Sequence, residues 1–293
     1  MKERHPIIDM HLHSHRASPG AIIEMEGIDP SALSFQPDKI AAPPTDDQLM
    51  RETMKMLKRY NIVKAVASGP MIDMWKEFDR ERIISGYFMW EEDFKNPENI
   101  EIIRKRYNSG KLDVIGELVP QSAGISPGDE LLDPYYSFAE EFDIPVGIHT
   151  GPCGSPGAPY KTPQSAWLMN PLLLEDALTR HPKLRIYVMH VGWPMIDEMV
   201  GIMYYYPNVY VDVAATNWLQ PLKEFHIYLK RLVDAGFGKR IMFGSDNMFW
   251  PEVIRISIEG IESADFLTYE QKRDIFYNNA VRFLRLEEKS DNY

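Results

Sequence analysis

Residues 6–13 read Pro-Ile-Ile-Asp-Met-His-Leu-His, and this stretch decides the fold that we predict. It has the apolar character of a buried strand, but it carries two histidines at its end. The chain continues with Ser14, His15 and Arg16. The glycine-rich phosphate loop that usually follows the first strand of an open doubly wound sheet is therefore missing. This absence favours a closed barrel over the open sheet.

Further short apolar runs recur along the chain, with helix-like segments between them. The eight predicted strands are Pro6–His13, Val63–Gly69, Ile83–Trp90, Asp113–Pro120, Ile144–Gly151, Arg185–Gly192, Asn208–Ala214 and Arg240–Asp246. Strands that alternate with helices imply parallel βαβ units, and eight such units close into a barrel without edge strands. We therefore predict an α/β fold, a (β/α)₈ TIM barrel, with the open doubly wound sheet as the alternative.

Helical spacing of apolar residues marks the segments between the strands. These segments are Asp46–Tyr60, Pro97–Asn108, Leu131–Phe142, Pro171–His181, Met195–Tyr205, Gln220–Ala235 and Glu252–Glu262, with Thr268–Leu284 as a last segment that would cap or close the outer ring. The length of 293 residues suits one barrel domain over residues 1–293. Two long connections, Ser14–Thr45 and Thr150–Met169, follow strands one and five, and such loops usually shape the active site.

Composition excludes several classes of protein. The net charge of −11 argues against a nucleic-acid binder, which needs a basic face. No apolar run approaches the roughly 20 residues of a membrane span. The single cysteine, Cys153, excludes an internal disulfide framework and suits the reducing cytoplasm. We expect a cytoplasmic protein with a small-molecule substrate, and a homodimer is an open alternative by base rate.

His11 and His13 stand two positions apart at the end of the first strand. Residues two apart on a strand point the same way, so both imidazoles project together near the top of the barrel. Two imidazoles on one face make a good pair of metal ligands. The alternative is a pair of hydrogen-bonded core histidines.

Other strand ends carry side chains of the same kind. His149 ends strand five, His190 ends strand six and Asp246 ends strand eight, each after an apolar run. Strand four contains Glu117, and a carboxylate in an apolar strand is expensive to bury unless it is paired or bound to a cation. Glu117 is thus either a metal ligand or one half of an ion pair with a nearby arginine.

Three residues in or beside the long loops are candidates for substrate contact. Arg16 and Tyr160 could bind an anionic substrate, and Trp193 closely follows the end of strand six. An aromatic side chain at that position could line a pocket, or it could pack under the loops. Loop chemistry does not identify the substrate.

The chain resembles the amidohydrolase superfamily, in particular amidohydrolase family 2, which includes aminocarboxymuconate semialdehyde decarboxylase and dicarboxylate lactonases. The resemblance rests on the start Ile7–His13, the histidines that end strands five and six, the Gly-Ser-Asp at 244–246, and the closing stretch Ile275–Leu284. It covers nearly the whole chain. It is specific for the superfamily but not for a substrate.

The resemblance implies a role for each of these residues. His11, His13 and His149 would be metal ligands, and Asp246 would be a ligand and proton shuttle. His190 would be a catalytic histidine in one-metal decarboxylases, or a ligand of the second metal in two-metal hydrolases. The segment around Glu117 looks more like that of TatD-like and two-metal members, where Glu117 would ligate metal. The number of metals therefore stays open.

The resulting prediction is a metal-dependent hydrolase of a carbonyl ester, lactone or amide bond. A divalent metal, expected to be Zn²⁺ with one or two per chain, would lower the pKa of a water molecule from 15.7 to about 7. Asp246 would accept its proton, and His190 would polarise the carbonyl or hold the second metal. The alternatives are non-oxidative decarboxylation of an aromatic or muconate-like acid and, from another class, a non-catalytic ligand-binding barrel.

Overall fold

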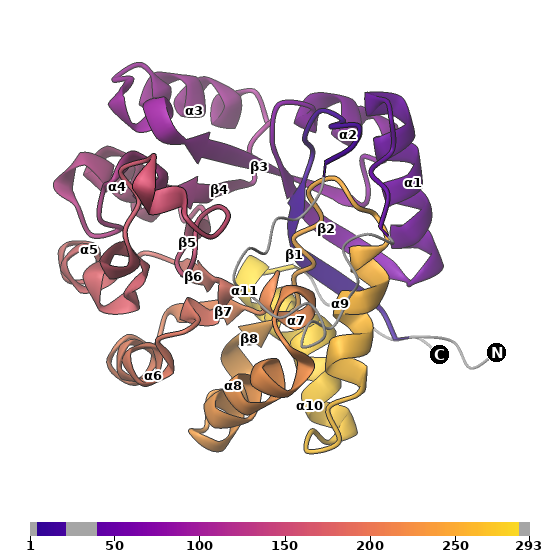
Figure 1. Cartoon of the computed structure of the whole chain (residues 1–293). Helices are drawn as coiled ribbons and strands as arrows, with labels where there is room; N and C mark the ends of the chain where they lie inside the picture. Colours follow the sequence, from indigo (N-terminus) through magenta and orange to yellow (C-terminus); the bar gives the residue numbers. More distant parts are fainter. Residues whose placement is uncertain (1–4, 22–39, 287–293) are drawn as a thin grey trace.

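The computed structural model describes residues 5–21 and 40–286, and in it eight parallel strands form a barrel surrounded by helices (Figure 1). The strands pair in chain order, from β1 with β2 to β7 with β8. Their bounds are β1 Ile7–His13, β2 Ile62–Ser68, β3 Ile83–Trp90, β4 Val114–Val119, β5 Val146–His149, β6 Ile186–Met189, β7 Val209–Asp212 and β8 Ile241–Met242. The predicted (β/α)₈ barrel is confirmed, and the open-sheet alternative is wrong.

Helices follow the strands, and most of them cover the outside of the barrel. They are α1 Asp46–Arg59, α2 Ile72–Phe78, α3 Asn99–Asn108, α4 Asp133–Glu141, α5 Glu175–Arg180, α6 Ile196–Tyr205, α7 Thr216–Leu219, α8 Leu222–Asp234, α9 Val253–Glu262, α10 Tyr269–Arg273 and α11 Asn279–Leu284. The start of α1 shows why they begin where they do. The Thr45 side chain accepts the Gln48 N–H, and Asp46 and Asp47 lie in the first turn, where the helix dipole favours negative charge. None of the helices in the described ranges is both long and apolar enough to cross a membrane.

The segment after β8 returns to β1 and closes the barrel. The Asp246 N–H donates to the His11 carbonyl at 2.8 Å. Gly244 lies in this seam, and a Cβ there would come within 2.9 Å of the Cβ atoms of both His11 and Ala214. Because real Cβ atoms do not approach so closely, the seam needs glycine at 244, and this close approach brings Asp246 beside β1.

Apolar side chains fill the amino-terminal part of the barrel interior. Ile8 and Met10 of β1 belong to one buried cluster with Tyr187 of β6. Phe283 of α11 packs against Tyr187 with its ring centroid 5.4 Å away, so α11 covers this end of the barrel. The last predicted segment is therefore helical, as expected, but it closes the barrel end rather than the outer ring. Polar side chains gather at the opposite, carboxyl end.

Several elements differ from the sequence-based prediction, among them the short helix α7 (Thr216–Leu219), which was not predicted. The helix α2 (Ile72–Phe78) was not predicted, because its seven residues are too few to show a clear helical period. The strand predicted over Arg240–Asp246 has regular pairing only over Ile241–Met242. The residues that follow β8 instead hydrogen-bond to β1 across the seam.

Both predicted long loops emerge at the carboxyl face. In the connection Ser14–Thr45, residues 22–39 lie outside the described part of the chain. The connection Thr150–Met169 is irregular apart from two short 3₁₀ turns, Ala158–Tyr160 and Ala166–Met169. The second loop is thus long and without regular helices or strands, as predicted.

Candidate metal centre

Six polar side chains converge at the carboxyl ends of five strands. They are His11 and His13 of β1, Glu117 of β4, His149 of β5, His190 directly after β6, and Asp246 in the segment after β8. All six are buried, with exposed fractions between 2% and 8%. The side chains are those singled out from the sequence, and the barrel brings them into one cluster.

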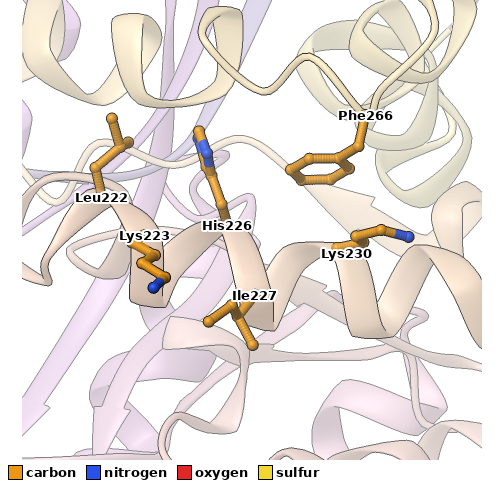
Figure 2. A pocket seen from close by; sticks show the side chains of 6 residues that line it. All are labelled: Leu222, Lys223, His226, Ile227, Lys230 and Phe266. Atoms are coloured by element: carbon orange, nitrogen blue, oxygen red, sulfur yellow. The ribbon is translucent and has the colours of Figure 1, made fainter.

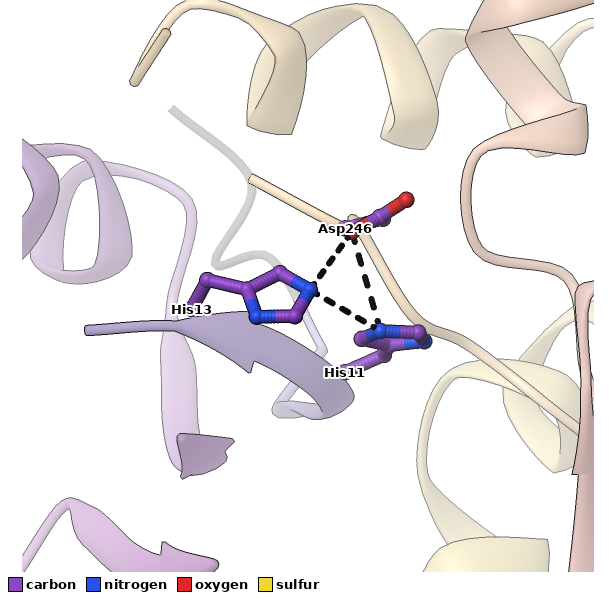
Figure 3. A group of neighbouring side chains, drawn as sticks. All are labelled: His11, His13 and Asp246. Atoms are coloured by element: carbon purple, nitrogen blue, oxygen red, sulfur yellow. Dashed lines mark hydrogen bonds and ion pairs between the residues drawn. The ribbon is translucent and has the colours of Figure 1, made fainter. Parts of the chain in front are cut away.

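His11, His13 and Asp246 form the first group (Figure 3). The Nε2 atoms of the two histidines lie 3.3 Å apart. Oδ1 of Asp246 lies 3.0 Å from Nε2 of His13 and 3.6 Å from Nε2 of His11. Two nitrogens and one oxygen at these separations can hold one divalent cation.

Glu117, His149 and His190 form the second group. Oε1 of Glu117 lies 2.5 Å from Nδ1 of His149 and 3.5 Å from Nε2 of His190. The two ring nitrogens lie 3.1 Å apart. The second group therefore offers the same kind of donor set as the first.

Glu117 faces both groups, with a different oxygen toward each. Its Oε2 lies 3.5 Å from Nε2 of His11 and 3.3 Å from Nε2 of His13, whereas its Oε1 faces the second group. Within the described ranges, all ion-pair partners of Glu117 are histidines, so it does not form the ion pair with arginine considered above. A carboxylate in this position can bridge two cations.

The outward ring nitrogens of His11 and His190 face oxygen acceptors, whereas Nδ1 of His13 is buried without a hydrogen-bond partner in the described part of the chain. Nδ1 of His190 lies 2.9 Å from the Ala214 carbonyl, and Nδ1 of His11 lies 3.1 Å from Oδ2 of Asp212. A carbonyl or ionised carboxylate only accepts, so each Nδ1 carries a proton, a tautomer inferred from these bonds. When these two rings are neutral, as metal ligands must be, their Nε2 atoms direct lone pairs toward the two groups.

The short separations between ring nitrogens show that these residues fit a divalent cation. The Nε2 atoms of His11 and His13 face each other, as do Nδ1 of His149 and Nε2 of His190. The remaining nitrogen of His149, Nε2, is hydrogen-bonded to the Pro152 carbonyl at 3.3 Å. Lone pairs at such separations repel unless a proton or a metal ion lies between them. Neutral imidazole nitrogens with carboxylate oxygens are the donors that zinc prefers.

The pKa shifts of the clustered side chains also indicate a site that favours a cation. Burial raises the pKa of the Glu117 carboxyl, but the charge of His11 and hydrogen bonds from the surrounding histidines outweigh it and hold that pKa well below its usual range. Burial lowers the pKa of His11, but the charges of Glu117 and Asp246 outweigh it and raise the pKa well above the ordinary value. The carboxylates therefore stay ionised, and the cluster favours added positive charge.

One buried carboxylate of the centre is absent from the residues predicted from the sequence. Asp212 is the last residue of β7 and is fully buried. Its Oδ1 accepts the backbone N–H groups of His190 and Ala214, both at 3.0 Å. The signal was present in the sequence, because a carboxylate in an apolar strand is the observation that singled out Glu117.

Asp9 ties the first strand to the segment after β8. Its Oδ1 accepts the backbone N–H of His11 at 3.1 Å and that of Ser245 at 2.9 Å. Burial raises the pKa of this carboxyl to about 6. Asp9 thus holds the main chain on both sides of the seam, next to the first group.

The three predicted substrate-contact residues lie in different surroundings. The Arg16 side chain is 71% exposed and pairs with Asp46 at 3.2 Å. Tyr160 is 93% exposed. Trp193 is half-buried, and its indole N–H is buried without a hydrogen-bond partner in the described part of the chain. Arg16 and Tyr160 therefore lie at the surface, and substrate contact by any of the three stays a prediction.

Aromatic rings stack beside His13. The ring of His15 lies parallel to that of His13 with centroids 4.6 Å apart, and it stacks on Phe249 at 5.5 Å. Phe88 packs edge-on against both histidines. Burial lowers the pKa of His15 to about 3, so this ring is neutral near pH 7. The first group is bounded on one side by this aromatic wall of His15, Phe88 and Phe249.

A separate groove of about 490 Å³ lies on the outer surface, along α8 (Figure 2). It is lined by Leu222, Lys223, His226, Ile227, Lys230 and Phe266. Nε2 of His226 donates to the Gly260 carbonyl at 2.8 Å. This contact joins two outer helices, so His226 has a structural role away from the cluster, as the sequence indicated.

Comparison with known families supplies the identity of the chain. The profile of the family described as amidohydrolase matches residues 8–286. The chain belongs to the amidohydrolase family. As an amidohydrolase it is a metal-dependent enzyme, and the cluster of histidines and carboxylates supplies groups that can bind the metal.

Solved structures with low sequence identity share the fold of this amidohydrolase. An uncharacterised TIM-barrel protein from Bordetella bronchiseptica is 18% identical over 96% of this chain and 99% of its own, with a TM-score of 0.68. A probable 2-pyrone-4,6-dicarboxylic acid hydrolase from Acinetobacter baumannii is 12% identical over 96% and 100%, with a TM-score of 0.61. A 2,6-dihydroxybenzoate decarboxylase from Rhizobium is 13% identical over 96% and 99%, with a TM-score of 0.58.

Among curated proteins, Protein fluG of Emericella nidulans is 21% identical to this amidohydrolase over 136 residues. The match covers 41% of this chain and 16% of that protein. The similarity therefore concerns a small part of the length of the curated relative.

Proposed function

We infer that this amidohydrolase hydrolyses a carbonyl ester, lactone or amide bond of a small molecule, with divalent metal at two adjacent positions. The observation that carries the proposal is the orientation of Glu117. Its Oε2 faces His11 and His13, and its Oε1 lies 2.5 Å from Nδ1 of His149. Two adjacent cations can stabilise both the attacking and the leaving oxygen of a displacement, which favours hydrolysis.

In this proposal the first group would hold one metal ion and the second group the other, and Glu117 faces both groups and would supply a carboxylate oxygen to each. Bound divalent metal would polarise the substrate carbonyl and lower the pKa of water from 15.7 to about 7. The residues hold the substrate carbonyl and the attacking water close together in a buried site, which raises their effective concentration. Zinc suits this donor set, and manganese also tolerates it.

Asp246 moves the proton in the proposed reaction. Burial raises the pKa of its carboxyl, but the charges of His11 and His13 outweigh it and lower the pKa below the ordinary value. The ionised carboxylate accepts a proton from the attacking water and returns it to the leaving group. Nδ1 of His190 is hydrogen-bonded to the Ala214 carbonyl, so Nε2 faces the second group, where it would help to hold the second metal ion or polarise the substrate carbonyl.

The second candidate reaction is non-oxidative decarboxylation of an aromatic acid. The aromatic wall beside His13 favours it, because stacked and edge-on rings suit a planar substrate. Both a decarboxylase of 2,6-dihydroxybenzoate and a probable hydrolase of 2-pyrone-4,6-dicarboxylic acid share the fold. In a decarboxylase a single metal would suffice, and Glu117 would be structural.

The test combines elemental analysis with a substrate panel. We expect close to two equivalents of metal per chain and release of acid from members of a lactone and ester panel, followed with a pH indicator. One equivalent of metal together with release of CO₂ from aromatic acids would favour decarboxylation instead. Full activity of metal-free protein would contradict both reactions.

The proposal includes zinc as the metal, a cytoplasmic location and a small-molecule substrate. The lone Cys153 suits a reducing compartment, and burial raises the pKa of its thiol, so it is not a ready nucleophile. Metal analysis of protein purified without added metal tests the first point, and cell fractionation tests the second. Light scattering of the purified protein tests whether it is a homodimer.

A further inference from the structure

Asp212 contacts members of both groups. It is fully buried at the end of β7. Its Oδ2 lies 3.1 Å from Nδ1 of His11, which belongs to the first group. Its Oδ1 accepts the backbone N–H of His190, which belongs to the second group. One carboxylate therefore supports a histidine on each side of Glu117.

The contact with His11 determines which ring nitrogen carries the proton. An ionised carboxylate only accepts hydrogen bonds, so Nδ1 of His11 donates to Asp212. In the neutral ring that a metal ion needs, Nε2 is then left with the lone pair, and this is the atom that faces His13 and Asp246. A His11 ring with the opposite tautomer could not bind a cation through Nε2. The carboxylate also makes the imidazole a more basic ligand.

The contact with His190 holds an unusual main-chain conformation. His190 and Val191 have φ angles of 59° and 49°, in the left-handed region that residues with a Cβ adopt rarely. Oδ1 of Asp212 accepts the N–H groups of His190 and Ala214, both at 3.0 Å. The Ala214 carbonyl in turn accepts from Nδ1 of His190 at 2.9 Å. Asp212 thus holds His190 through its main chain directly and through its ring by way of Ala214.

Asp212 is also close enough to His11 and His190 to be considered as a ligand. Its hydrogen bonds argue against that role. Oδ1 accepts two backbone N–H groups, and Oδ2 meets Nδ1 of His11, the nitrogen turned away from His13. Both oxygens are therefore occupied on the outer side of the cluster.

We propose that Asp212 is a positioning residue of the metal centre, which sets the tautomer of His11 and orients His190 without contacting metal or substrate. This inference rests on the proposed metal-dependent function. Carboxylates that support a metal-binding histidine typically change metal affinity about 10–100-fold when they are removed. The expected effect is therefore large enough to measure directly.

The variant Asp212→Asn keeps the shape of the side chain and removes one of its two acceptor oxygens. The remaining oxygen stays with the two backbone N–H groups, which cannot turn, so the amide NH₂ faces Nδ1 of His11. His11 is then driven to the form with its proton on Nε2. We expect zinc affinity of the first group to fall about 10–100-fold, measured by competition with a chromophoric chelator.

Nitrogen-15 NMR of zinc-loaded protein with labelled histidines gives a readout that does not depend on turnover. We expect wild-type His11 to be protonated at Nδ1 and zinc-bound at Nε2, and the Asp212→Asn variant to lose this signature. The spectrum of His11→Gln assigns the signal. The matched control is Asp274→Asn, because Asp274 is also a buried acid but pairs with Lys239 outside the cluster. That variant should lose stability and keep its zinc affinity.

The results distinguish a positioning role of Asp212 from a role as a metal ligand and from failure of the proposed function. Unchanged zinc affinity and an unchanged His11 signal in Asp212→Asn would overturn the positioning role and leave the metal-dependent function standing. Loss of one zinc equivalent with the wild-type His11 tautomer retained would make Asp212 a ligand, which also overturns it. Wild-type protein that binds neither Zn²⁺ nor Mn²⁺ would overturn the proposed function and this inference together.

Discussion

The two groups of the metal centre differ in what supports their histidines. In the first group, His11 is backed by the carboxylate of Asp212. In the second group, His149 and His190 are backed by main-chain carbonyl oxygens. A carboxylate partner increases the basicity of an imidazole, whereas a neutral carbonyl mainly orients it. Ligand-type side chains at equivalent strand ends therefore need not form equivalent sites, and we expect the first group to bind metal more tightly.

The largest effect is expected from His11→Ala. The substitution removes a nitrogen that lies 3.3 Å from Nε2 of His13 and 3.5 Å from Oε2 of Glu117, so it removes a ligand beside the bridging carboxylate. We expect loss of metal and no turnover above background, measured by elemental analysis and initial rates. His226→Ala is the matched control, because His226 lies in the outer groove and should leave both unchanged. Turnover by the metal-free His11→Ala protein would refute the expectation.

Asp246→Asn should have the next largest effect. The amide cannot accept a proton, so we expect kcat to fall about 10²–10⁴-fold. The amide oxygen can still face His13, so metal content should fall less than in His11→Ala. Steady-state kinetics and elemental analysis on the same preparation measure the two quantities. A kcat within a few-fold of wild type would mean that another group accepts the proton.

His149→Ala tests directly whether the two groups differ in metal affinity. It removes a ligand of the second group only, so we expect one metal equivalent to be lost and the more tightly held one to remain. A chelator titration of wild-type protein should likewise show two steps, with the weaker step absent from His149→Ala. Release of both metals in a single step would contradict the expectation that the first group binds metal more tightly than the second.

Gly244→Ala should disturb the first group through the main chain. The added Cβ would meet the Cβ atoms of His11 and Ala214 at 2.9 Å, so we expect a loss of about 1–3 kcal/mol in the free energy of unfolding. Zinc affinity of the first group should fall with it. Gly201→Ala in α6 meets nothing within 4 Å and should instead stabilise the protein by roughly 0.5–1 kcal/mol. Urea unfolding of metal-free protein measures both variants.

The smallest effect is expected at Asp133, whose partners are Arg180 and His181 on the outer surface. Burial raises the pKa of Asp133, but hydrogen bonds from these partners outweigh it and lower the pKa below 3.8. Because the folded pKa is lowered, ionised Asp133 stabilises the fold above pH 3.8, and this contribution disappears as pH falls through the folded pKa.

At pH 7, Asp133→Asn should therefore cost at most about 1 kcal/mol, since the pair is partly exposed. Urea unfolding at pH 7 and at lower pH should show the difference between variant and wild type shrinking as the solution becomes more acidic. Zinc affinity of both groups should not change. A change in either affinity would mean that the outer surface and the metal centre are coupled.

The barrel and the six clustered side chains could be predicted because the evidence for them is local in sequence. Alternating strands and helices define the βαβ units, and the last residues of parallel strands meet at one end whatever the helices contain. The direction of a loop side chain depends on partners far along the chain. Arg16 is bonded to Asp46, which begins α1, and no pattern near Arg16 indicates that contact.

The hydrogen-bond partners of the clustered histidines could not be predicted from the sequence either. His11 and Asp212 are 201 positions apart in sequence, and their contact depends on how closely β1 and β7 approach each other on either side of β8. Asp212 itself had a visible signal as an acid at a strand end. Its role as a partner of His11 rather than a member of either group follows only from the positions of its two oxygens.

The seam between β1 and the segment after β8 has a consequence for the order in which this protein matures. Asp9 and Ser245, which are hydrogen-bonded across it, are 236 residues apart. On the ribosome, His11 and His13 are made long before Asp246, so the first group cannot exist on a chain that has not yet reached Asp246. A metal ion held there would join the earliest and the latest parts of the barrel and stabilise only the completed fold. Metal loading would then mark the end of folding, and premature release of an unfinished chain would leave it without this stabilisation.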